Sequence, residues 1–354
     1  MRNDMSRCNL RPELRPDPVL TASIYCTGLL DAALFHAVRP FWRAFQAEKP
    51  DSGCFLWVMR YGRGGEHLKV RIHGPDDLRP LLQRNLEEIV SAFFASLPPS
   101  EVPPQKRGWG RTPAIDAEDA VEEDHPDRIL LWTTYGRSHV SLGGDPYLSD
   151  DRYVSLFTRC LASSSEIVLS LEPGEDGMLP FKLRQNSLLK ALIAGLAILD
   201  FSLDKRLEYI TYHRDWLLRF VLSKDRLSES EPQEQLLRSF EARVEQMGKA
   251  LLVLGKSAQS QWSQGREAIL QAEGPFTAWQ RAVVDLMDYV ALFRDDPAYR
   301  LDPFATDAIF APLFKMLHGF SNQLGNNIAN EALAHHILLR TATQPDFSME
   351  LGAA

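Results

Sequence analysis

The sequence predicts an α+β protein, with a small antiparallel sheet and helices in the N-terminal half and a helical bundle in the C-terminal half. Three observations predict this fold. Two short runs near the start are rich in β-forming residues, and a glycine-rich turn joins them. One of these runs alternates strictly between apolar and polar residues. From about residue 205 onward, apolar residues recur at three- and four-residue spacing in long segments, as in packed helices.

The elements of the N-terminal half follow from these patterns in order. Residues 22–25 form a short apolar run that predicts a strand, and residues 30–46 show helical spacing. Residues 54–60 and 67–73 flank the Gly-Arg-Gly-Gly turn and predict a β-hairpin. The remaining expected elements are a helix over 76–96, a strand over 129–135 and a helix over 150–161.

The C-terminal half begins after a Pro- and Gly-containing break at residues 173–177. Its expected helical segments are 181–200, 205–222, 233–254, 276–294 and 306–340. We expect one domain over 19–345, mixed to about residue 175 and helical over 178–340. Residues 1–18 and 346–354 are expected to be flexible, 98–113 to form a loop, and the acidic stretch 116–127 to be solvated.

The composition excludes several classes of protein. A net charge of -8 over 354 residues disfavours a general nucleic-acid binder. Residues 1–18 lack the apolar core of a signal peptide, and the longest apolar stretch, residues 188–199, is too short to cross a bilayer. The four cysteines form no Cys-x-x-Cys pair, so a cytoplasmic protein without a membrane segment is expected.

Familiar catalytic motifs are missing from the sequence. It contains no Walker A loop, no dinucleotide-binding glycine fingerprint, no His-Glu-x-x-His and no Gly-x-Ser-x-Gly. We therefore predict neither a metal site nor an organic cofactor.

The first candidate site lies on the alternating run that follows Arg60. His67, Lys69, Arg71 and His73 fall on one face of the predicted strand. Cationic groups side by side repel one another unless an anion lies opposite, which points to a substrate carboxylate or to an acidic part of the protein. The alternative is a solvated face of the sheet.

The second candidate is a loop after the strand at 129–135. Residues 135–144 are dense in Gly, Arg, His and Ser, and include Arg137, His139 and Ser141. Such a loop suits ligand binding. A turn whose polarity is incidental is the alternative reading.

The third candidate lies near the C-terminus. His318 and Asn322 are four residues apart and would share a helix face, and Glu331 follows. Gly319 and Gly325 interrupt the helical pattern, which suggests a bend, a close contact or a site. The alternative is a core histidine satisfied by a neighbouring carbonyl.

These three patterns occur in the order seen in a known family. Residues 55–71, Phe-Leu-Trp-Val-Met-Arg-Tyr followed by His-Leu-Lys-Val-Arg, resemble the "F-x-R-Y … H-[IL]-R-[LV]-R" signature of the C-terminal domain of lantibiotic dehydratases. Residues 135–144 look like its "Y-x-x-E-x-x-R-Y-G-G" motif, and residues 318–325 are similar to its "H-x-x-x-N-R-L-G" motif. The similarity covers residues 23–340.

The resemblance implies a tailoring enzyme of a ribosomally made, post-translationally modified peptide. The family's chemistries are elimination of glutamate from glutamylated Ser or Thr, and a formal [4+2] cycloaddition of two dehydroalanines with release of the leader. The implied partners are a precursor peptide with its leader and a separate tRNA-dependent glutamylating dehydratase. Homodimerisation is compatible with the resemblance, and direct binding of nucleic acid or membrane is not expected.

The resemblance also implies roles for individual residues. His318, Arg71 and His67 match catalytic positions: His318 as acid or base, Arg71 as carboxylate clamp, His67 as an orienting group. The implied substrate-binding residues are Arg60, Lys69, Arg137, His139, Ser141 and Asn322.

Three departures from the motifs remove charge. Ser141-Leu142 replaces Arg-Tyr, Gln323 replaces Arg, and Phe320 stands where many members carry a second histidine. These losses favour a cyclase, or a member without catalysis, whereas the breadth of the family favours elimination, so the two reactions stay close to even. A non-catalytic module that binds the peptide or a dehydratase, and an unrelated α+β protein, remain as alternatives. The site hypothesis requires Arg71, the 137–144 loop and His318 to converge in space.

Overall fold

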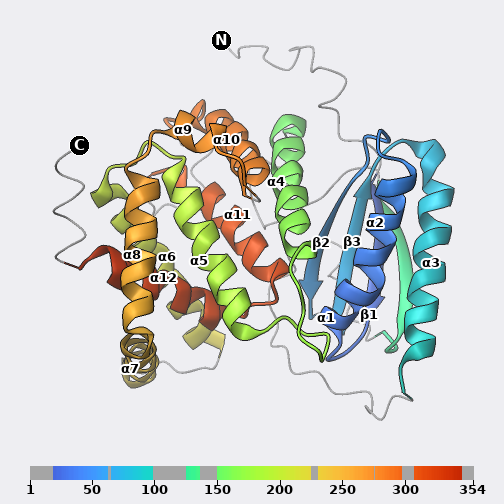
Figure 1. Ribbon diagram of the computed structural model, residues 1–354, viewed down its shortest axis with the longest axis horizontal. Helices are drawn as coiled ribbons and strands as arrows, with labels where there is room; N and C mark the ends of the chain where they lie inside the picture. Colours follow the sequence, from blue (N-terminus) through green and yellow to red (C-terminus); the bar gives the residue numbers. More distant parts are fainter. Residues whose placement is uncertain are drawn as a thin grey trace. The chain divides into compact units, whose positions relative to one another are not determined.

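The computed structural model describes residues 19–62, 65–98, 125–135, 150–224, 230–274, 276–296 and 307–344. The chain forms two compact units, called here the sheet unit (residues 1–169 and 292–301) and the helical unit (residues 170–291 and 302–354). The sheet unit contains a four-stranded antiparallel sheet, and the helical unit contains helices α5 to α12 (Figure 1). This confirms the predicted α+β class.

The sheet has the strand order β2-β3-β1-β4, and all neighbours are antiparallel. Its strands are β1 (Val19–Tyr25), β2 (Phe55–Tyr61), β3 (His67–His73) and β4 (Ile129–Tyr135). The predicted hairpin is confirmed as β2 and β3, in which Phe55 pairs with His73 and Tyr61 with His67. Strand β1 lies between β3 and β4, so the centre of the sheet joins segments about a hundred residues apart.

Helices cover the apolar face of the sheet (Figure 1). They are α1 (Leu30–Ala33), a π-helical turn (Leu34–Val38), α2 (Arg39–Glu48), and α3 (Arg79–Ser96) after a short 3-10 turn (Asp76–Leu78). The predicted helix over 30–46 is therefore confirmed, with a wide turn inside it. Pro40 follows that turn and has no N–H to donate to the carbonyl of residue 36, which accounts for the irregular bonding there.

Helix α4 (Asp151–Leu169) covers the outer edge of β2. The backbone N–H of Val58 donates a hydrogen bond of 3.1 Å to the hydroxyl of Ser165. The Trp42 indole of α2 donates to the Glu166 carboxylate at 2.5 Å, which joins α4 to the helices on the apolar face. An exposed strand edge is a template for unwanted pairing, and here a helix occupies it.

The two ends of the segment between α3 and β4 lie close together. The Arg128 guanidinium donates to the Pro98 carbonyl at 2.5 Å. The backbone N–H of Arg128 bonds the Tyr25 carbonyl at 2.8 Å, and the Asp127 carboxylate accepts from the N–H of Thr27 at 2.7 Å. The sequence between these ends, which contains most of the expected loop and acidic stretch, lies outside the described residues.

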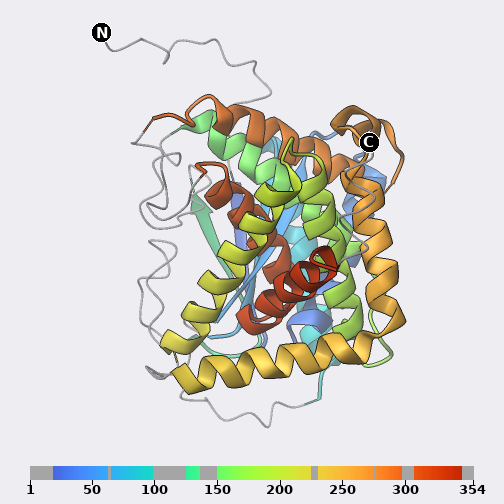
Figure 2. The ribbon, with the colours of Figure 1, turned by 90° about the vertical axis from the view of Figure 1, so that its left-hand side faces the viewer.

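The helical unit contains α5 (Phe181–Ala197), α6 (Leu203–Lys224), α7 (Ser230–Met247), α8 (Lys249–Trp262), α9 (Arg266–Gln271), α10 (Thr277–Ala291), α11 (Phe310–Gln323) and α12 (Ile328–Ala342). The expected helical segments 233–254 and 306–340 are each divided between two helices, α7 with α8 and α11 with α12. Gly248 adopts φ +47° between α7 and α8, a backbone conformation that suits glycine, and the chain changes direction there (Figure 2). The short helix α9 was not predicted.

Helix α12 is the centre of the helical unit. It packs against α5, α6, α7 and α8, and most of its side chains are buried. A helix packed on several sides is apolar around most of its circumference, which explains why α12 has no clear polar face. In the part of the chain that the structure describes, no helix combines the length and the apolar character needed to cross a membrane.

Candidate functional site

The polar face of β3 is buried. His67, Lys69, Arg71 and His73 share one face of the strand, as their spacing predicted, and their exposed fractions are 1%, 4%, 2% and 2%. The interpretation of this run as a solvated face is therefore wrong. We call these four residues the cationic face.

Each of the two cations of this face lies against an aromatic ring of β2. The Lys69 ammonium lies 4.2 Å from the centroid of the Tyr61 ring, and the Arg71 guanidinium lies 4.5 Å from that of Trp57. Arg71 also donates to the Tyr61 hydroxyl at 3.4 Å. The faces of aromatic rings attract cations, and the effect grows when water is excluded. The strand pairing thus holds both cations in fixed directions.

The two histidines of the cationic face are neutral at physiological pH. Burial, followed by the nearby charges of Lys69 and Arg71, lowers the pKa of His67 to about 4, although a hydrogen bond to the Gly65 carbonyl opposes this. Burial and Arg71 lower the pKa of His73 to about 3. The face therefore carries the charges of one lysine and one arginine.

The geometry of His67 fixes its tautomer. Its Nδ1 lies 2.7 Å from the Gly65 carbonyl oxygen, which can only accept, so Nδ1 carries the proton. Its Nε2 then presents a lone pair, and no residue in the described ranges bonds it. A neutral imidazole held this way can accept a hydrogen bond or a proton.

Arg60 lies on the opposite face of the sheet. It pairs with Leu68 across the hairpin, and its guanidinium lies 2.6 Å from the carboxylate of Asp31 on α1. The Asp31 side chain is fully buried and that of Arg60 is 10% exposed. A buried carboxylate requires such a partner, which gives Arg60 a structural role away from the cationic face.

The predicted binding loop with Arg137, His139 and Ser141 lies outside the described residues. Its part in a site stays a prediction. So does its convergence with Arg71 and His318.

His318 forms a hydrogen-bonded pair with Glu331 in the helical unit. Its Nδ1 lies 2.8 Å from the carboxylate of Glu331, which is 2% exposed, whereas the imidazole itself is 32% exposed. Burial opposes a positive charge on His318, but the attraction of Glu331 and its hydrogen bond outweigh that effect and raise the pKa of His318. The interpretation of His318 as a core histidine satisfied by a carbonyl is wrong, since its partner is a carboxylate.

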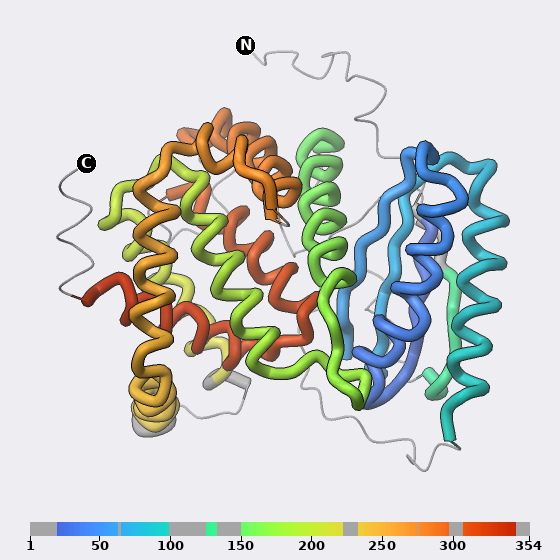
Figure 3. Tube along the Cα trace, in the orientation of Figure 1, coloured from blue at the N-terminus to red at the C-terminus, as the bar shows by residue number. Residues whose placement is uncertain are grey.

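A tight corner joins α11 to α12 (Figure 3). Across this corner, the Glu331 carboxylate lies 2.8 Å from His318 Nδ1. Gly325 adopts φ +78°, and its N–H bonds the Asn322 carbonyl at 2.9 Å. The N–H of Asn326 bonds the Ser321 carbonyl at 3.1 Å, which completes a Schellman motif. The glycine of the motif His-x-x-x-Asn-x-Leu-Gly therefore ends the helix.

Groups from α12 and α5 fix the corner. The Asn327 side chain accepts from the N–H of Asn330 at 2.8 Å and caps α12. From α5, Arg184 donates to the Gly325 carbonyl at 2.6 Å. Gly319, which was also expected to interrupt the helix, continues α11.

The sequence pattern placed His318 and Asn322 together, and the structure confirms that both lie on α11. Asn322 is half-buried and gives its backbone carbonyl to the corner. Sequence reasoning missed the partnership of Glu331 with His318. Its thirteen-residue separation gives no periodic pattern, although a polar residue in the first turn of an otherwise apolar helix was the available signal.

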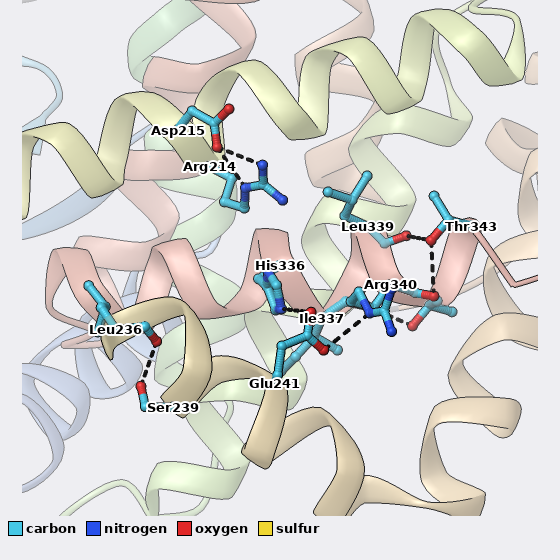
Figure 4. Close-up of polar contacts among 11 residues, drawn as sticks. Arg214, Asp215, Leu236, Ser239, Glu241, His336, Ile337, Leu339, Arg340 and Thr343 are labelled. Atoms are coloured by element: carbon cyan, nitrogen blue, oxygen red, sulfur yellow. Dashed lines mark hydrogen bonds and ion pairs between the residues drawn. The ribbon is translucent and has the colours of Figure 1, made fainter. Parts of the chain in front are cut away.

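His336 of α12 contacts helix α7. His336 Nε2 lies 3.3 Å from the Glu241 carboxylate of α7, and Arg340 Nε lies 3.2 Å from the other oxygen of the same group (Figure 4). This cluster ties α7 to α12. Across the described ranges, no group of three or more His, Cys, Asp or Glu side chains is arranged to hold a metal ion.

Comparisons with known proteins agree with this architecture. The model of the family "Lantibiotic biosynthesis dehydratase C-term" matches residues 20–342. No curated protein sequence matches the chain.

Two solved structures share the fold. The "pyridine synthase, TbtD, from thiomuracin biosynthesis" superposes with a TM-score of 0.61 at 13% identity, covering 96% of this chain and 100% of that one. TsrL superposes with a TM-score of 0.57 at 13% identity, covering 91% and 93%. Since the family model spans nearly the whole sequence, the chain belongs to the family of lantibiotic biosynthesis dehydratase C-terminal domains.

Proposed function

We propose that this protein is a tailoring enzyme that acts on a ribosomally made precursor peptide, at a Ser or Thr residue that has been glutamylated or dehydrated. The observation that carries the proposal is the His318–Glu331 pair. A partly exposed imidazole held by a buried carboxylate, with a raised pKa, is a proton donor suited to neutral pH. Membership of the family supports a peptide as the substrate.

Glutamate elimination uses these groups as follows. A base takes the proton from Cα of the modified residue, and neutral His67, whose Nε2 presents a lone pair, is the candidate for this role. The Cβ–O bond breaks, a Cα=Cβ double bond forms, and glutamate departs with the bonding electrons. Protonated His318 would stabilise the negative charge that develops on the substrate carbonyl oxygen. On the sheet unit, Lys69 and Arg71 would hold the carboxylates of the departing glutamate, provided that the predicted convergence of Arg71 with His318 holds.

Cycloaddition is the second candidate reaction, and one observation favours it. Gln323 and Phe320 occupy motif positions where the resemblance implies cations, and both side chains are fully buried in the helical unit. Phe320 packs against Trp279 with ring centroids 6.0 Å apart. A formal [4+2] addition needs two substrate arms held together and a proton donor, but fewer groups for a departing dicarboxylate.

The family also suggests the partners. A precursor peptide with its leader would be the substrate, and a separate glutamylating protein would supply it for the elimination reaction. TbtD is a pyridine synthase, and its similar fold supports cycloaddition as the reaction of this chain.

Mass spectrometry of two incubations tests the proposal. The protein is mixed with a glutamylated precursor peptide in one and with a dehydroalanine-bearing peptide in the other. Loss of glutamic acid from the first establishes elimination, and ring formation with leader release from the second establishes cycloaddition.

The His318→Asn variant keeps a hydrogen-bonding side chain but cannot gain or lose a proton near neutral pH. The rate of whichever reaction the protein catalyses should fall about 100-fold or more in this variant. The Arg43→Ala variant on the exterior of α2 serves as the control, since its side chain is 46% exposed. Binding of both peptides without any mass change would favour the non-catalytic module instead.

A further inference from the structure

Three buried polar atoms around Glu331 have no hydrogen-bond partner among the described residues. They are the Tyr209 hydroxyl on α6, the second carboxylate oxygen of Glu331, and Nε2 of His335. Tyr209 and His335 are fully buried, and Glu331 is 1% exposed. Buried polar groups in folded proteins are almost always hydrogen-bonded, so three unsatisfied ones at one place require an explanation.

The three groups lie beside one another where α6 packs along α12. His335 stands one turn after Glu331, and its Nδ1 lies 3.0 Å from the Glu331 backbone carbonyl. The ring centroids of Tyr209 and His335 are 6.5 Å apart. The other carboxylate oxygen of Glu331 is the one that lies 2.8 Å from His318 Nδ1, so Glu331 links this cluster to the proposed proton donor.

The hydrogen-bonding capacities of the three atoms are complementary to one water molecule. A carbonyl only accepts, so His335 carries its proton on Nδ1 and presents a lone pair at Nε2. The carboxylate oxygen of Glu331 also accepts, whereas the Tyr209 hydroxyl can donate. A water that donates to Glu331 and His335 and accepts from Tyr209 satisfies all three, and buried waters typically make about three such bonds.

We propose that Tyr209 and His335 are positioning residues which, through one buried water, hold the Glu331 carboxylate against His318. The proposal concerns the charge state of His318. Only the part that this charge would play in catalysis rests on the proposed function.

Among the groups around this cluster, Glu331 is the anion that raises the pKa of His318. Burial and Glu331 raise the pKa of Tyr209, and burial lowers that of His335, so both stay uncharged. From α6, burial and His335 lower the pKa of His213, and Arg214 forms an ion pair with Asp215 at 2.7 Å. From α5, the Arg184 guanidinium bonds the carbonyls of Leu179 and Gly325.

Proton NMR titration of His318 in the peptide-free protein tests the proposal. The Tyr209→Phe variant removes only the hydroxyl, and the pKa of His318 should fall by about 0.5–1 unit, which corresponds to a 3–10-fold loss of the protonated form on the alkaline side. Glu331→Gln should lower the pKa further. Tyr153→Phe, which changes another fully buried tyrosine in the sheet unit, should leave it in place.

The outcomes separate this inference from the proposed function, because no peptide is present. An unchanged His318 pKa in folded Tyr209→Phe protein would overturn the inference even if the enzyme processes peptides. A lowered pKa would support it even if both peptides remain unmodified. In a crystal structure, a water within about 3.2 Å of all three atoms is expected, and a dry gap there would also overturn the inference.

Discussion

The hydroxyl of Ser165 accepts the backbone N–H of Val58 at 3.1 Å and donates to the Leu161 carbonyl at 2.9 Å, so one side chain of α4 closes the edge of β2. Ser165→Ala leaves the buried N–H of Val58 without a partner and should lower the free energy of unfolding by about 1–3 kcal/mol in urea titrations. Ser164→Ala is a matched control, because this buried hydroxyl bonds only a carbonyl of its own helix. Equal losses in the two variants would show that the edge contact contributes nothing.

The His318–Glu331 pair predicts a pH-dependent contribution to stability. The folded pKa of His318 is raised above its ordinary 6.5, so the stabilisation is complete below about pH 6.5 and is lost as the pH rises through the folded value. The loss of unfolding free energy in Glu331→Gln should therefore be larger at about pH 5.5 than at about pH 9. Asp288→Asn breaks an exposed pair with Arg266 that contains no histidine, and its effect should not vary over that window.

The ion pair of Arg60 with Asp31 should be a large stability determinant. Arg60→Ala leaves a fully buried carboxylate without this partner and should cost about 3–5 kcal/mol in chemical denaturation. Arg238→Ala, which breaks a pair whose two side chains are 66% exposed, should cost less than about 1 kcal/mol. If Arg60→Ala is as stable as the unmodified protein but binds the peptide more weakly, Arg60 binds substrate, as the sequence motif predicted.

The guanidinium of Arg71 should matter for its shape as well as its charge. Arg71→Lys keeps the charge but loses the flat group that stacks on Trp57 and can bind a carboxylate through two nitrogens. Product formation in the peptide assay should fall about 10–100-fold, as expected for losing one bond to a charged group. Unchanged turnover in Arg71→Lys would mean that only the positive charge is needed.

Gly325 should be intolerant of a side chain. Its φ of +78° is a conformation that costs other residues about 1–2 kcal/mol, so Gly325→Ala should lower thermal stability accordingly. Gly265→Ala is a suitable control, because Gly265 has φ -68° and a Cβ added there would meet open space. Loosening of the corner should also lower the pKa of His318, which the same NMR titration would detect.

The sequence predicted strands and long helices well, because their periodic patterns are local. Alternation over residues 67–73 placed four polar side chains on one face, and the structure confirms that placement. Their burial was not predictable, since it depends on contacts between residues that are far apart in the sequence. Arg60 is a clear example: it adjoins the same motif, but the pairing with Leu68 turns it to the other face.

The candidate site of the helical unit was predicted only in part, for a similar reason. The spacing of His318 and Asn322 identified a helix face, and Gly325 identified its end. The contact with Glu331 depends on the angle of the corner between two helices, and the positions of Tyr209 and His335 depend on how α6 packs on α12. Such angles are set by side-chain packing rather than by sequence spacing.

The hydrogen bond from Arg128 to the Pro98 carbonyl has a consequence for changes in the length of the chain. It holds together the two ends of the segment between α3 and β4. Because the entropy of closing a loop grows only slowly with its length, insertions or deletions between these anchors should leave the pairing of β1 with β4 unharmed. The length of the segment between these anchors can therefore change without rebuilding the sheet.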